Sequence, residues 1–149
     1  MMNTLSPKHL SLTLCILMGA NHAEAASADR HAKFSPCPDS PNCVSTQSTD
    51  KARFIEPLQY SGSHSDARQK LIDILEKSKG VRLVQVETDY IHAEFRSLIF
   101  GFIDDLELYF PPAQTIIHIK SASRKGNYDF GANRRRVERL RAAFEKLAK

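Results

Sequence analysis

The sequence predicts an α+β fold in which one antiparallel sheet of about five strands carries two helices on one face. Apolar and polar residues alternate, as in half-buried strands, in four successive stretches between residues 81 and 124. Two further stretches, one before and one after these four, have the apolar spacing of an amphipathic helix. Strands joined by short connections pair antiparallel, and the helices must bury their apolar stripes on the sheet.

The expected order of elements is strand, helix, four strands, helix. Residues 53–60 form the first candidate strand, and Pro57 places it at an edge of the sheet, where a missing amide is tolerated. The remaining strands are expected at 81–87, 90–96, 103–110 and 115–124. In the stretch 90–96, alternation places one set of side chains, Tyr90, His92, Glu94 and Arg96, opposite another, Ile91, Ala93 and Phe95.

Each helix is expected from one apolar stripe. The first covers about 65–78, with Ser63 or Ser65 as N-cap and Gly80 beyond its end. The second covers about 133–148. Their stripes consist of Ala67, Leu71, Ile74 and Leu75 in the first, and of Val137, Leu140, Phe144 and Leu147 in the second.

The N-terminus has the pattern of a cleaved signal peptide. Lys8 precedes an apolar run at 10–20, and Ala23 and Ala25 supply the small residues that a signal peptidase needs. The run is too short for a permanent membrane span, which takes roughly 20 residues. Residues 1–25 are therefore assigned to a signal peptide, and the mature chain is expected in the periplasm without a transmembrane segment.

Residues 26–50 are rich in serine, proline and aspartate and are expected to form an irregular arm before a single domain at 51–149. Cleavage of the signal peptide removes Cys15 and leaves Cys37 and Cys43 as the only cysteines. A disulfide between them is the favoured interpretation in an oxidising compartment. A zinc site usually has four ligands, and redox-active pairs are usually separated by two residues. We therefore expect neither a metal site nor a redox-active cysteine pair.

Polar residues gather between positions 90 and 133 and form the candidate site. They are Glu94, Arg96, Asp104, Asp105, Arg124, Asp129 and Asn133. In the first interpretation, Arg96 or Arg124 forms ion pairs with the acids, while Asp129 and Asn133 cap the last helix. We expect Arg96, in mid-strand, to belong to such a buried network, and the alternative of an open site is kept for Arg124.

In a second interpretation the same region binds an anion. Gly126 and Gly131 frame a loop before the last helix, and helix N-termini favour negative charge. The lysine and hydroxyl residue of a phosphate-binding loop are missing, so the glycine spacing alone is weak support.

A third interpretation is an enzyme in which Asp104 and Asp105, or Glu94, act as acid and base, with His92 or His118. Neighbouring residues of a strand point to opposite faces, which argues against an Asp104–Asp105 dyad.

The 149-residue chain is 42% hydrophobic and 26% charged, which is typical of a globular protein, and its net charge is +4. Basic residues are concentrated after residue 133. The sequence has no nucleic-acid-binding signature, so nucleic acid is not expected as a partner.

Three segments, "CPDSPNCVS", "YIHAEFRSLIFGFIDDLE" and "SASRKGNYDFGANRRRVE", resemble the signature stretches of the family called domain of unknown function 1499. The resemblance implies an exported or membrane-associated protein without an assigned activity. The chain departs from the family in having no tryptophan.

Together these features predict an exported periplasmic binding or scaffold protein without a cofactor. The expected partner is a small anionic molecule or a component of the cell envelope. The alternative is a small hydrolase-like enzyme that acts on an envelope-derived substrate, and the non-enzymatic function is favoured.

Overall fold

The computed structural model describes residues 34–97 and 101–147. The predicted signal peptide and the first residues of the arm lie outside the described residues. The elements are β1 (Cys43–Ser45), β2 (Leu58–Gln59), α2 (His64–Glu76), β3 (Val81–Val86), β4 (Tyr90–Arg96), β5 (Ile103–Tyr109), β6 (Ile116–Ser123) and α3 (Ala132–Leu147).

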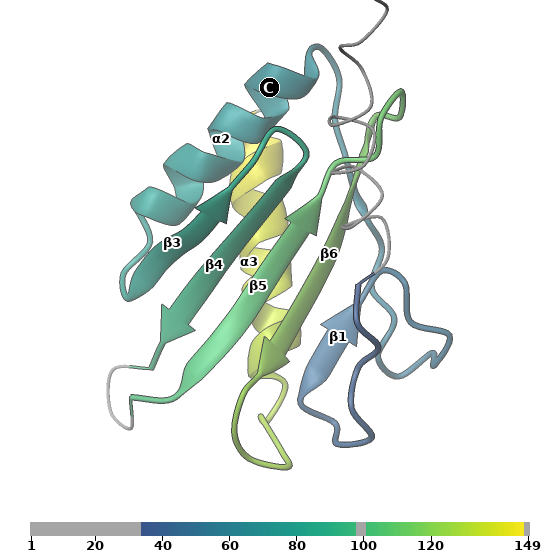
Figure 1. Ribbon diagram of the computed structural model, residues 1–149, viewed down its shortest axis with the longest axis vertical. Helices are drawn as coiled ribbons and strands as arrows, with labels where there is room; N and C mark the ends of the chain where they lie inside the picture. The colour runs from purple at the N-terminus through teal and green to yellow at the C-terminus, as the bar shows by residue number, and fades with distance from the viewer. Residues whose placement is uncertain (1–33, 98–100, 148–149) are drawn as a thin grey trace, which may run out of the picture.

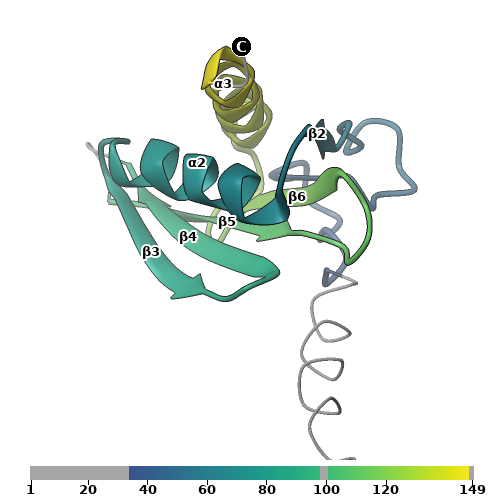
Figure 2. The same cartoon turned by 90° about the horizontal axis from the view of Figure 1, so that it is seen from above.

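The fold is α+β, as predicted. The strands lie in the order β1-β6-β5-β4-β3 and pair antiparallel, and β2 also pairs with β6. Both helices cover the same face of the sheet, and the opposite face carries no helix among the described residues (Figures 1 and 2). The sheet therefore has one apolar and one polar face.

The core lies between the helices and the sheet. Alternation along the central strands is confirmed, because Ile91, Leu108 and Ile119 are buried toward the helices. The side chain of Ser63 caps α2 by accepting a hydrogen bond from the Asp66 amide at 3.0 Å. Phe144, in α3, is also buried in this core.

Two strands differ from the predicted ones. The predicted strand at 53–60 is reduced to the two residues of β2, because Pro57 lacks an amide for the ladder. The arm is not irregular throughout, since β1 lies within it and pairs with β6. Phe54 forms an isolated parallel bridge with Ser45 of β1. The arm is thus part of the sheet.

The predicted disulfide between Cys37 and Cys43 is present, with a Cα–Cα distance of 5.6 Å. Cys43 is buried and begins β1. The disulfide therefore fixes the path by which the chain enters the sheet.

We expect the Cys37→Ser variant to lose about 2 kcal/mol of unfolding free energy, the low end of the range for disulfides, because the loop is short. Urea unfolding of oxidised protein measures this loss. Wild-type protein in reductant should show the same loss, and the variant should not respond to reductant. Equal stability of oxidised wild type and variant would contradict the prediction.

Candidate functional site on the open face of the sheet

The face of the sheet opposite the helices carries a compact group of charged side chains, which we call the open-face cluster. It consists of Arg82, His92, Glu94, Asp105 and Arg124. Antiparallel register places Arg82 beside Glu94, and Glu94 beside Asp105. Three strands and the residue that follows β6 therefore contribute to one surface.

The acids of this cluster are hydrogen-bonded to neighbouring arginine and histidine side chains. Glu94 accepts hydrogen bonds from Arg82 Nη2 at 2.7 Å and from Arg124 Nη2 at 2.5 Å. Asp105 binds Arg124 Nε at 2.7 Å and lies 2.7 Å from His92 Nε2. The predicted pairing of Arg124 with Glu94 and Asp105 is thus present, and Arg82 extends it.

The charges of the cluster lie in two layers. The side chains of Glu94 and Asp105 are only 12% and 23% exposed, whereas those of Arg82 and Arg124 are 70% and 42% exposed. The guanidinium groups therefore cover the carboxylates, and solvent meets mainly positive charge.

Ion pairing also fixes the protonation state of the acids. Hydrogen bonds from Arg82 and Arg124 lower the pKa of Glu94. Burial would raise the pKa of Asp105, but hydrogen bonds from Arg124 and His92 outweigh it and lower that pKa. Both carboxylates are ionised at neutral pH, so neither is suited to donate a proton as a general acid.

We expect stability to fall as the pH drops below about 4, because the pKa values of Glu94 and Asp105 are lower in the folded protein than their ordinary values. The unfolded chain takes up these protons first, so the stabilisation is complete above the ordinary values and is lost below them. Urea unfolding between pH 6 and 3 measures the slope of the free energy of unfolding against pH. The slope should be shallower in Asp105→Asn, and an unchanged slope would contradict this assignment.

The arm contacts the other end of the polar face. Phe34 packs with Tyr90 and Tyr109 in a small buried cluster. Lys120 Nζ donates to Ser35 Oγ at 2.6 Å and to Glu107 Oε1 at 3.1 Å. This end of the face is therefore covered by the arm, unlike the exposed arginines of the open-face cluster.

A separate set of polar groups, which we call the helix-side network, lies on the opposite face of the sheet. Arg136 Nη2 donates to Asp104, and Arg136 Nη1 donates to Ser121 Oγ at 2.9 Å. Ser121 Oγ donates in turn to Asn133 Oδ1 at 2.7 Å. The predicted site is thus divided by the sheet, because Asp104 and Asn133 lie away from Glu94, Asp105 and Arg124.

Sequence reasoning missed Arg136 as a member of the site. It immediately precedes Val137 and lies four residues before Leu140, so it falls on the buried stripe of α3. A charged residue in an apolar stripe was the signal that could have identified it. Its guanidinium carbon lies 4.7 Å from the centre of the Phe95 ring, a cation–π contact.

Asp129 caps α3, as predicted. Its carboxylate accepts hydrogen bonds from the amides of Gly131 and Asn133 at 2.8 and 2.9 Å. Burial would raise the pKa of Asp129, but these amides outweigh it and lower that pKa. These two amides are therefore not free to bind an external anion, contrary to the second interpretation of the sequence. Asn133 lies inside α3 and does not cap it.

The expectation for Arg96 is wrong. Arg96 is the last residue of β4 and is exposed, so it is not part of a buried network. The strand ends there, and the sheet no longer covers the side chain. Arg96 alternates with Glu94 and adds a further guanidinium group to the open face.

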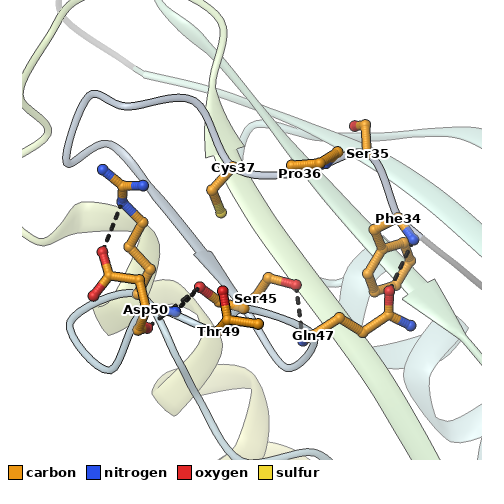
Figure 3. Close-up of a pocket in the computed structure, with 10 residues that line it drawn as sticks. Phe34, Ser35, Pro36, Cys37, Ser45, Gln47, Thr49 and Asp50 are labelled. Carbon is orange, nitrogen blue, oxygen red and sulfur yellow. Dashed lines mark hydrogen bonds and ion pairs between the residues drawn. The ribbon is translucent and has the colours of Figure 1, made fainter.

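A pocket of about 270 Å³ lies beside the arm, between Cys37, Ser45 and Gln47 (Figure 3). Its polar groups bind one another: Gln47 Oε1 accepts from the Phe34 amide at 2.9 Å, and Arg53 pairs with Asp50 at 3.5 Å. The first bond joins the start of the arm to the segment that follows β1, and the second is a local pair within that segment.

Within residues 34–97 and 101–147, no cluster of histidine, cysteine and acidic residues could hold a metal ion. No helix in the described part of the chain has the length and apolar character needed to cross a bilayer.

Fold and site together define an α+β protein with one helix-covered sheet face and one charged face. The chain belongs to the family described as protein of unknown function (DUF1499), whose model matches residues 33–144. The resemblance inferred from the three sequence motifs is thereby confirmed. A search of curated proteins finds no match.

Proposed function

We propose that this protein is exported to the periplasm and binds an anionic component of the cell envelope through the open-face cluster, without catalysing a reaction. The proposal rests on the two layers of charge in the open-face cluster, with exposed arginines above less exposed carboxylates. Arg82 and Arg124 lie above Glu94 and Asp105, and ion pairs of 2.5 to 2.7 Å with these carboxylates orient both guanidinium groups. A partner with negative charge would meet arginines already held in place.

The arginines also retain donors for a partner. Among the described residues, the Nη1 group of Arg124 has no hydrogen-bond acceptor, since its bonds are made by Nε and Nη2. Arg96 is exposed and lies on the same face of β4 as Glu94, so three arginines accompany the carboxylates of Glu94 and Asp105. Arginine presents donors in a planar fork that suits phosphate and carboxylate groups.

The same geometry argues against the hydrolase alternative. Arginine pairing keeps Glu94 and Asp105 ionised. The hydrogen bond of His92 to Asp105 resembles part of a catalytic pair. No serine, threonine or cysteine of the described residues hydrogen-bonds to His92, so a nucleophile for such a pair is missing there.

Thermal melts in inorganic phosphate test the binding function. Wild-type protein should gain melting temperature in a saturable manner, because a ligand that binds only the folded state stabilises it. Arg124→Ala should lose this gain. Arg135→Ala, an exposed change beside the start of α3, serves as control and should keep it. A gain that persists in Arg124→Ala and disappears in Arg135→Ala would place the anion at the helix start instead.

Vesicles distinguish a lipid headgroup from free phosphate as the source of the anion. Binding to phosphatidylglycerol vesicles, but not to phosphatidylcholine vesicles, would indicate a membrane surface. A phosphate response without vesicle binding would indicate a soluble anion. Absence of both responses would contradict the proposal.

Export is tested separately by N-terminal sequencing of the protein released from the periplasm. We expect the mature chain to begin at Ala26 or within a few residues of it. Full-length protein confined to the cytoplasm would contradict export.

A further inference from the structure

A second pocket lies on the helix-covered side of the sheet, between α2 and α3. Its volume is about 310 Å³, near the lower end of small-molecule sites. Its walls are apolar and come from both helices and from β4. They consist of Ile74, Leu75, Phe95, Leu140 and Ala143.

The charged residues that line this pocket are all basic. They are Lys79, Arg136 and Arg139, and no acidic residue belongs to the lining. Asp104 already pairs with Arg136. Lys79 and Arg139 are exposed and make no ion pair with the described residues, so they leave positive charge at the pocket.

Arg136 also has an incomplete set of hydrogen bonds. Its Nη groups are bonded to Asp104, Ser121 and Asn133, but its Nε is buried without an acceptor in the described structure. Unsatisfied buried donors are rare and costly in folded proteins. A bound oxygen acceptor beside Arg136 would remove this deficit.

We propose that the pocket between α2 and α3 binds a small amphipathic carboxylate, such as a short acyl chain with a free acid group. The apolar walls would hold the chain, Lys79 and Arg139 would hold the carboxylate, and one carboxylate oxygen would accept from Arg136 Nε. The site goes beyond the anion-binding function of the open face, because the sheet separates the two and their ligands differ in apolar content.

Calorimetric titration with sodium octanoate tests the proposal, with acetate as the probe for the charge alone and 1-octanol as the probe for the chain alone. We expect saturable binding of octanoate, and binding at least about tenfold weaker for acetate and 1-octanol, because each lacks one of the two interactions. Equal affinity for 1-octanol and octanoate would overturn the assignment of a carboxylate.

Two variants locate the site. Ala143→Phe fills the pocket and should abolish octanoate binding, with an unchanged circular dichroism spectrum as the check of folding. The exposed pair Lys79→Ala/Arg139→Ala should weaken binding about four- to tenfold, the loss expected for two exposed charge contacts. Arg82→Ala, on the opposite face, should bind octanoate as wild type does.

Octanoate binding by the wild type and by these variants decides whether the pocket is the binding site. Loss of octanoate binding in Ala143→Phe together with weaker binding in the double variant supports the proposal. Absence of saturable octanoate binding by the wild type overturns it, and so does binding that neither variant changes. A phosphate response of the open face would be unaffected in either case, so the two proposals fail independently.

Discussion

Replacement of Arg136 with alanine is expected to lower the free energy of unfolding by about 3 to 5 kcal/mol, the usual cost of breaking a buried ion pair. The side chains of Arg136 and Asp104 are only 10% and 15% exposed. Loss of the guanidinium leaves Asp104 without its cation and removes the contact with the Phe95 ring. Chemical denaturation of the purified variant measures the change.

Arg139→Ala is the matched control, because Arg139 lies on the same helix but is exposed. It should change stability by no more than about 0.5 kcal/mol. The double variant Arg136→Ala/Asp104→Asn should recover part of the loss, since the unpaired charge is removed as well. If Arg136→Ala is as stable as Arg139→Ala, the helix-side network does not stabilise the fold.

The second large effect is expected for Asn133→Ala, at about 3 kcal/mol, because several buried polar groups lose a partner together. Asn133 Nδ2 donates to the carbonyl of Asn42 at 2.8 Å and to Ser123 Oγ at 2.9 Å. These hydrogen bonds join α3 to the arm and to β6, and the Asn133 side chain that makes them is fully buried. Urea unfolding measures the loss.

Asn127→Ala is the control for this prediction, because Asn127 is exposed in the loop before α3. It should leave the unfolding free energy within about 0.5 kcal/mol of wild type. A similar small change in Asn133→Ala would show that the arm is held without these hydrogen bonds.

Much of the fold could be predicted because the alternation of apolar and polar residues along a strand shows which side chains are buried. Ile91 and Leu108 alternate with polar residues in strands that are long enough to show the period, and both are buried. The same alternation correctly separates Asp104 from Asp105. Strand β1 was missed because a strand of three buried residues shows no alternation.

The division of the candidate site could be predicted only in part. Alternation places Asp104 and Asp105 on different faces, but it does not say that Arg136 of a distant helix reaches Asp104. Nor does it say that Arg124 folds back over Glu94. Such contacts depend on how helices and strands pack, and on the path of long side chains. Arg96 was misplaced because strand position alone does not determine burial at the end of a strand.

The most direct test of the open face as the anion site is a titration of isotopically labelled protein with inorganic phosphate, followed by amide NMR shifts. We predict saturable shifts at Arg82, Glu94 and Arg124, and at Arg96 beside them. The amides of Gly131 and Asn133 should stay unchanged, because Asp129 occupies them. Shifts confined to the start of α3, or no saturable shifts on β3, β4 and the end of β6, would contradict the proposed function.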